Sequence, residues 1–378
     1  MTMPAPERLI TARFAIVVTS GLFYFLGLAM LTPVIPHYVE DELGGGSIAV
    51  GVAVGSFAIG ALVLRPYSGR IGDRSGRRVL IIGGSLIVAA ATACYGIVPE
   101  LWWLAVMRAI AGIGEAAFFV GAATMITDLA PIDRRGEAVS YWSVAVYGGL
   151  AFGPALGEFV AGDDRYTAAW LVAAGLALVA ALLGLATSDA GRPPKSEEHI
   201  SLINRNALLP GTVLLLGLIP LAGFSAFLPL YAEDLGLDAG PIFLLYGVLI
   251  LAVRVLGARL PDRLGGRTAA TGALVLSGTG VGVIAAWDSV VGVVVGTVVL
   301  AAGMSLMYPA LLLLAFDGVP DSERAAVLGT FSAFFDLSQG VGTPLCGGVA
   351  AATGIRGAFA TGSVTAALGV LVLRRRRS

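Results

Sequence analysis

Twelve apolar segments, each long enough to cross a lipid bilayer as a helix, dominate this sequence. A helix rises about 1.5 Å per residue, so about 20 residues cover the ~30 Å hydrocarbon core. With 57% apolar and 13% charged residues, the chain lies outside the composition of soluble domains. It therefore predicts an all-α membrane protein. The segments lie near residues 13–38, 47–67, 79–98, 101–128, 136–161, 166–187, 207–232, 239–258, 268–286, 289–316, 324–351 and 355–373.

The basic residues predict which side of the membrane each loop faces, because short loops rich in Lys and Arg stay in the cytoplasm. With the N-terminus inside, nearly all of the 24 basic residues lie at or near the cytoplasmic face. The exceptions are Arg165 and Arg356 outside and Arg108 within a segment. The basic tail at residues 374–377 then anchors the last helix at the inner surface rather than binding nucleic acid. Both termini of this multi-pass protein are expected in the cytoplasm, in the cell membrane.

The two halves of the chain repeat one another around the loops that follow the second and eighth segments. At one constant offset, Arg65, Arg70, Asp73, Arg74, Gly76 and Arg78 recur as Arg254, Arg259, Asp262, Arg263, Gly265 and Arg267. We expect two pseudo-symmetric six-helix bundles at residues 1–190 and 207–378, joined by a polar cytoplasmic linker at 191–206. In such a parallel pair, a substrate site lies between two rocking bundles.

The loop after the second segment combines glycines, which allow a tight turn, with arginines, which suit an anionic membrane surface. Its distinctive residues are Gly69, Asp73, Arg74, Gly76, Arg77 and Arg78. This pattern resembles the signature loop of the major facilitator superfamily (MFS), and the resemblance covers essentially the whole chain. It implies the MFS fold, with Asp73 latching the halves against the N-terminus of the eleventh helix. Arg74, Arg77 and Arg78 would be its charge partners, and Asp262 and Arg263 are its counterparts in the second half.

The fourth segment carries Arg108, Gly112, Gly114 and Glu115, which resemble the family's motif of Arg followed by Gly-x-Gly. The glycines allow close helix packing, and the strand and phosphate context of a nucleotide site is missing. Helical rise from Trp102 at the outer interface places Glu115 about 20 Å deep, where an ionisable residue is costly and by default functional. Arg108 lies two turns from Glu115 on the same face. Proton coupling and a purely structural ion pair between them are therefore both open.

The fifth segment carries Gly149, Gly153, Pro154 and Gly157, which resemble the Gly-x-x-x-Gly-Pro-x-x-Gly motif found chiefly in proton-driven exporters. Proline removes a backbone hydrogen bond and bends the helix, while the glycines let it press against a neighbour. Packing alone would also explain such a glycine-rich segment. Glu158 stands where many exporters have a further glycine, which weakens the assignment to drug exporters in particular.

Asp336 lies near mid-membrane in the eleventh segment, with no basic residue three or four positions away on that segment. We therefore expect it to take up and release a proton more freely than Glu115. Proton coupling needs such a group, because one charge crossing a 100 mV potential yields ~2.3 kcal/mol. Glu115 and Asp336 are rival or cooperating proton carriers. The alternative is that each accepts backbone hydrogen bonds and never changes protonation.

A substrate cavity is expected to be lined by adaptable side chains on the fourth, seventh and tenth segments, which face the cavity in the resembled family. The candidates are Phe118, Phe119, Phe224, Phe227, Met304, Met307 and Tyr308. Helix packing against lipid explains the same residues nearly as well. The two histidines and two cysteines show no metal-binding or disulfide spacing. We expect no metal and no cofactor, with a proton gradient as the energy source.

Together these features favour a monomeric proton-coupled exporter that moves small amphipathic or polar organic molecules by alternating access. An uptake symporter for a sugar or organic acid is the alternative. An enzyme is not expected, because the sequence has no Gly-x-Ser-x-Gly, no metal-binding histidine pair and no phosphate-binding loop with Lys.

Overall fold

The computed structural model describes residues 9–131, 134–162, 164–189, 204–256, 263–320 and 324–375. The described part of the first half contains α1 (Ala12–Asp41), α2 (Ser47–Ser75), α3 (Arg77–Ala93), α4 (Leu101–Leu129), α5 (Arg135–Ala161) and α6 (Tyr166–Leu185). The described part of the second half contains η2 (Arg205–Ala207), α7 (Leu208–Asp234), α8 (Ala239–Leu256), α10 (Gly266–Ala286), α11 (Val290–Phe316), α12 (Arg324–Thr353) and α13 (Arg356–Arg375). The predicted all-α membrane fold is confirmed, since each of the twelve apolar segments corresponds to one long helix.

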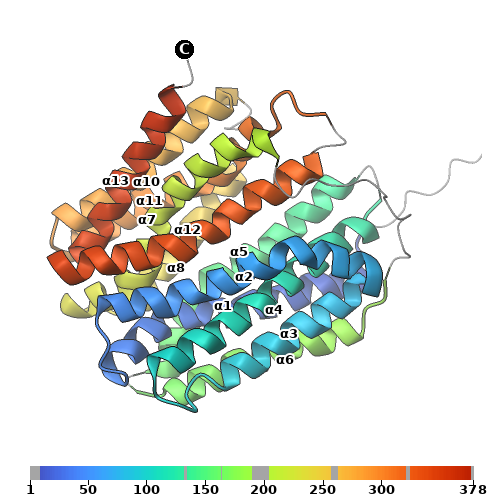
Figure 1. Cartoon of the computed structure of the whole chain (residues 1–378), viewed down its shortest axis with the longest axis horizontal. Helices are drawn as coiled ribbons and strands as arrows, with labels where there is room; N and C mark the ends of the chain where they lie inside the picture. Colours follow the sequence, from blue (N-terminus) through green and yellow to red (C-terminus); the bar gives the residue numbers. More distant parts are fainter. Residues whose placement is uncertain are drawn as a thin grey trace, which may run out of the picture.

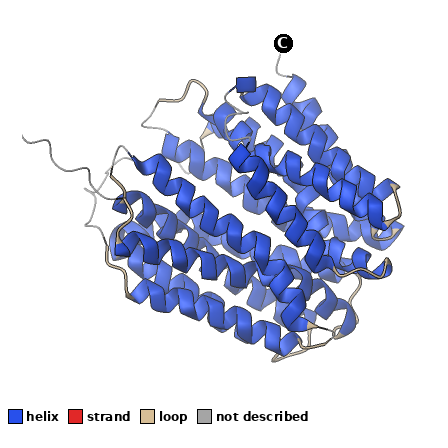
Figure 2. Ribbon diagram, turned by 180° about the vertical axis from the view of Figure 1, so that it is seen from behind, coloured by secondary structure: helices blue, strands red, loops and turns tan. Residues whose placement is uncertain are grey.

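Nine of the described helices are long and apolar enough to cross a membrane by themselves. The other three fall short for visible reasons. α3 has only 17 residues and begins with two arginines, the apolar part of α8 is Ala239–Val253, and α12 carries Asp336 and Gln339 in its interior. All three lie among the apolar nine (Figure 1), and the described helices form one bundle (Figure 2). They are therefore spans of the same bundle, and Asp336 of α12 is buried within it.

The helices of each half pack on one another in matching ways. In the first half α1 packs on α5 and α6, and α4 packs on α2 and α3. In the second half α7 packs on α12 and α13, and α11 packs on α8 and α10. Figure 1 shows the two groups, the first from blue to green and the second from yellow-green to red. The repeat in the sequence is thus also a repeat of packing. Up to residue 203, the linker expected at 191–206 lies outside the described residues.

Glycines set very short distances between the helices of the first half. A Cβ built on Gly112 of α4 would lie 1.9 Å from the carbonyl oxygen of Phe57 on α2. One built on Gly60 of α2 would lie 1.9 Å from the carbonyl oxygen of Ala109 on α4. No other residue fits at either position without moving a helix. α2 and α4 are therefore locked together just beside Glu115.

The halves contact one another at one end of the molecule, along α2 with α12 and α5 with α8 (Figure 1). A Cβ on Gly347 of α12 would lie 2.4 Å from the carbonyl oxygen of Ser47, where α2 begins. Further along, a Cβ on Gly340 would be 3.4 Å from the side chain of Ile59. The two helices therefore diverge toward the end of the molecule that carries the start of α1 and the end of α13. We name that end the open end and the opposite one the closed end.

Candidate functional site

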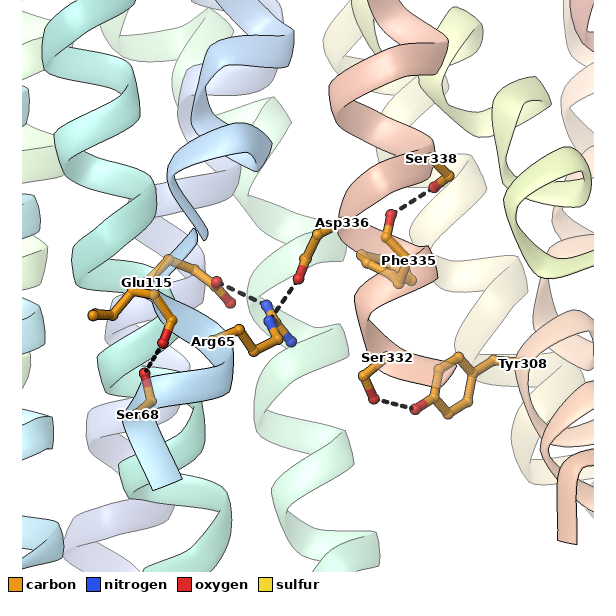
Figure 3. A network of polar contacts seen from close by, with 9 residues as sticks. Arg65, Ser68, Glu115, Tyr308, Ser332, Phe335, Asp336 and Ser338 are labelled. Atoms are coloured by element: carbon orange, nitrogen blue, oxygen red, sulfur yellow. Dashed lines mark hydrogen bonds and ion pairs between the residues drawn. The ribbon is translucent and has the colours of Figure 1, made fainter. Parts of the chain in front are cut away.

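Arg65 lies between the two halves and binds an acid on each side. Its Nη2 donates a hydrogen bond of 3.0 Å to Oε2 of Glu115 on α4. Its Nε lies 2.6 Å from Oδ2 of Asp336 on α12, across the boundary between the halves (Figure 3). The exposed fractions of the three side chains are 15%, 9% and 7% in this order, so all are largely withdrawn from solvent. We name these residues the Arg65 triad.

The helix packing explains why the three side chains meet. Glu115 follows Gly112, the residue that brings α4 against α2, and so its carboxylate reaches the same level of α2 as Arg65. Asp336 precedes Gly340 by about one turn, at the level where α12 begins to separate from α2. The side chain of Arg65 spans the widening gap. The Arg65–Asp336 pair is therefore an inter-half contact placed close to the point of divergence.

The two acids are held by Arg65 in different ways. The contact with Glu115 has hydrogen-bond geometry. The contact with Asp336 is close but not directional, because Arg65 Nε and Asp336 Oδ2 have no hydrogen-bond partner among the described residues. The guanidinium also lies 5.3 Å from the centre of the Phe119 ring. One cation faces two carboxylates, so the triad has a net charge of −1 when both are ionised and is neutral when one carries a proton.

Arg108, the basic residue expected near Glu115, has other partners. Its Nε donates to the carbonyl oxygen of Ala53 at 3.1 Å and its Nη2 donates to that of Val54 at 3.3 Å, both on α2. Its guanidinium stacks 4.7 Å from the centre of the Phe57 ring. The structure therefore does not show the ion pair between Arg108 and Glu115 that the sequence left open. The close approach of α2 to α4 offers Arg108 backbone carbonyls first, and it ties these helices together.

Arg65 was not expected at this site, because the pattern of basic residues assigned it to the cytoplasmic face. The second segment was expected to end near residue 67, but α2 continues to Ser75 and places Arg65 in its interior. The expectation that Asp336 lacks a basic neighbour was correct only for its own helix. The repeat in the sequence was the signal that could have indicated Arg65. Arg65 and its counterpart Arg254 each stand within the second or eighth apolar segment, near its end.

The loop that resembles the family signature joins α2 to α3 through Gly76, whose φ of 96° favours glycine. Nε of Arg77 lies 3.5 Å from Oδ2 of Asp128 at the end of α4. The backbone N–H of Arg78 donates to Oδ1 of Asp189 at 3.0 Å. The described contacts of these arginines therefore stay within the first half.

The latch residues themselves are only partly described. The surroundings of Gly69 and the side chain of Asp73 lie outside what the structure describes, and so does the whole of Asp262. Arg74 and Arg263 are described, and both side chains are exposed. The latch role of Asp73 stays a prediction.

The glycines of the fifth segment face α1 of the same half. A Cβ on Gly157 would lie 1.9 Å from the carbonyl oxygen of Met30, and one on Gly153 would lie 2.9 Å from the backbone nitrogen of the same residue. Gly149 meets α1 one turn earlier, and Pro154 lies inside the helix. This face of α5 therefore holds α1 and α5 together, while another face of α5 contacts α8 across the boundary between the halves.

The expected cavity residues divide into two groups. Most are buried in the interior of their own half: Phe118, Phe224, Phe227, Met304 and Met307. Phe118, for example, stacks on Tyr24 with 3.7 Å between the ring centres. Phe119 and Tyr308 are only partly buried and flank the triad, with the Tyr308 hydroxyl 3.4 Å from Oγ of Ser332 on α12 (Figure 3).

Comparison with known proteins decides the family. A family model described as the Major Facilitator Superfamily matches residues 17–284 and 242–378, which together cover nearly the whole chain. The chain belongs to the major facilitator superfamily. An uncharacterized MFS-type transporter of Salmonella typhimurium is 32% identical over 98% of both chains. Multidrug resistance protein 1 of Bacillus subtilis is 27% identical over 94% of both chains.

Solved structures of MFS transporters share the fold. The nucleoside transporter NupG superposes with a TM-score of 0.82 at 12% identity, covering 97% of this chain and 100% of NupG. A bacterial homolog of the human lysosomal transporter Spinster, inward-facing and unoccupied, superposes with a TM-score of 0.78 at 15% identity, covering 98% and 95%. At such identities the likeness shows the fold alone. As an MFS protein, the chain is a multi-pass membrane transporter for small molecules that works as a single-chain unit, and it is not an enzyme.

Proposed function

We propose that this MFS transporter exports small organic molecules across the cytoplasmic membrane in exchange for protons, with both termini in the cytoplasm. The observation that carries the proposal is the Arg65 triad, in which two carboxylates from opposite halves share one guanidinium. Buried charges are tolerated when they are paired, and an unpaired carboxylate favours its protonated form. A proton on one acid is therefore the simplest way to neutralise the triad.

The position of the Arg65–Asp336 pair links protonation to movement. It crosses between the halves where α2 and α12 begin to diverge, so its strength contributes to the preference for the closed-end contacts. A proton on Asp336 removes the charge that attracts Arg65 and leaves Arg65 with Glu115 alone. Alternating access then follows if the proton and the substrate occupy the region around the triad in turn.

Two observations support export rather than uptake. The glycine and proline motif of α5 resembles one found chiefly in proton-driven exporters, and a 27% identical relative is named a multidrug resistance protein. Uptake of a sugar or organic acid with protons is the second candidate, because solved structures of the same fold include transporters named for nucleosides and peptides.

The experiment uses everted membrane vesicles that contain the transporter and an internal pH-sensitive dye. After energisation has acidified the interior, compounds from a panel of amphipathic cations, anions and neutral molecules are added outside, on the former cytoplasmic side. Exchange predicts that a substrate enters and drives protons out, so the interior becomes less acidic. Symport predicts no such release. Vesicles carrying Asp336→Asn are the matched control, since that variant is expected to release no protons on addition of any compound.

A further inference from the structure

Glu158 lies at the closed end, on the face of α5 that meets the other half. It is one turn before the end of α5 at Ala161. A Cβ built on Gly240 of α8 would lie 3.2 Å from Cγ of Glu158, so the side chain packs directly on the α8 backbone. Its Oε1 is buried and has no hydrogen-bond partner among the described residues. An ionised carboxylate is costly in such a place, because no group among the described residues replaces the water that Oε1 has lost.

Acids of the other half stand close to this contact. Asp238 lies just before α8, two residues before the Gly240 backbone on which Glu158 packs, and it interacts electrostatically with the Glu158 carboxyl, as does Glu233 near the end of α7. Both are acids and both belong to the other half. Glu40, near the end of α1, interacts in turn with Glu233. Closing the two halves at this end therefore brings acids from both of them together.

Basic groups at this end do not compensate for Glu158. Nδ1 of His37 lies 3.3 Å from Oε2 of Glu233 rather than at Glu158. The guanidinium of Arg165 lies beside Gly162, past the end of α5, where a Cβ would be 3.0 Å from its Nη2. Neither forms an ion pair with Glu158 in the part of the chain that the structure describes.

We propose that Glu158 is a second proton-binding site, which takes up a proton when α5 closes on α8 and gives it up when the two helices part. Once the helices separate, water reaches the carboxyl group, and the ionised form is stable. Closure removes that water and places the carboxyl opposite Asp238 and Glu233. Because the proton and the closed end stabilise the same state, each promotes the other by linkage. The exchanged proton comes from and returns to water at the closed end.

This site differs from the Arg65 triad in position and in role. The triad lies at the level where α2 and α12 begin to diverge and includes a cation, whereas Glu158 lies near the closed end and has no cationic partner among the described residues. The proposed consequence is a gate that responds to pH. Acidification favours closure of this end, whatever the direction in which substrate moves.

The test measures closure directly, without substrate and without a proton gradient. Spin labels are attached at Ile97→Cys and Val290→Cys, exposed positions at the closed end of the two halves, in a background in which Cys94 and Cys346 are replaced. Distances in reconstituted protein are recorded by double electron–electron resonance at about pH 5 and about pH 8. We expect the long-distance population of the otherwise native protein to grow several-fold at the higher pH. In the Glu158→Gln variant the short distance between the two labels should predominate at both pH values.

Further variants separate Glu158 from its surroundings. Glu158→Asp keeps a titratable group and should keep a pH response, and Glu158→Met should behave as Glu158→Gln does. Glu233→Gln removes an exposed acid and should leave most of the response intact. The proposal is overturned if the native side chain gives no pH response, or if Glu158→Gln retains the full response. It is also overturned if Glu233→Gln alone removes the response. Since transport is not measured, failure of the Arg65 triad as the coupling site would leave this result unchanged.

Discussion

Nε of Arg65 on α2 and Oδ2 of Asp336 on α12 lie 2.6 Å apart and join the two halves of the transporter through an ion pair. The same guanidinium donates to Glu115, so one cation serves two acids. Removing the cation is expected to leave two buried carboxylates without a partner, and both then become protonated or force water into the site.

Replacing Arg65 with Gln should therefore abolish coupled transport and destabilise the protein. Loss of one partner of a buried ion pair typically costs about 3–5 kcal/mol. Thermal unfolding in detergent and proton release in vesicles are the two measurements. Arg135→Gln, at an exposed position near the start of α5, is the matched control and should change neither. Unchanged proton release in Arg65→Gln would show that the triad plays no part in coupling.

The acids of the triad should differ in what their amide variants lose. Asp336→Asn removes the charge that crosses between the halves, so transport should no longer respond to a pH gradient, while exchange of labelled for unlabelled substrate continues. Glu115→Gln leaves the inter-half pair with Asp336 in place and should weaken the response without abolishing it. Gradient-driven uptake into everted vesicles, compared with substrate exchange, measures both effects. A normal gradient response in Asp336→Asn excludes this residue as the carrier.

The contact between α2 and α4 should tolerate no side chain at Gly112. Its Cβ would lie 1.9 Å from a backbone oxygen of α2, so Gly112→Ala must push the helices apart. Overpacking of this kind typically costs about 1–3 kcal/mol. Gly175→Ala in α6 is the control, because its Cβ would meet nothing within 4 Å. The melting temperature should fall for the first variant and stay level or rise slightly for the second. Equal melting temperatures would contradict the close packing.

The family resemblance predicts a latch at Asp73, and Asp73→Asn tests it. The variant should insert into the membrane at normal levels but transport several-fold more slowly. It lacks the negative charge that interacts favourably with the helix dipole at the N-terminus of α12. Substrate-driven proton release per amount of inserted protein is the quantity to compare. Native rates in Asp73→Asn would remove the latch role.

The fold was predictable because long apolar segments and a repeat at constant offset depend on nothing but the sequence. The depth of Glu115 and Asp336 followed from helical rise. Their shared partner did not, because it depends on how far α2 continues beyond residue 67 and on which helix lies opposite. Arg108 shows the same limit, since helix periodicity places it near Glu115 but the glycine contact gives it backbone partners on α2.

The cavity residues were harder to predict for a related reason. Aromatic residues such as Phe118 and Phe119 are neighbours in sequence, but one is fully buried against Tyr24 and the other faces Arg65. A helix turns by about 100° per residue, so two adjacent residues point in different directions. Which of them faces the cavity depends on how the helix is rotated about its axis, and composition does not report that rotation.

Proton release on substrate binding by purified protein tests the central role of the triad most directly. A pH dye in weakly buffered detergent solution reports protons released when a compound identified in the vesicle assay is added. The native protein should release protons, and the double variant Glu115→Gln with Asp336→Asn should bind the compound and release none. If the double variant binds and releases as many protons as the native protein, the triad is not the coupling site.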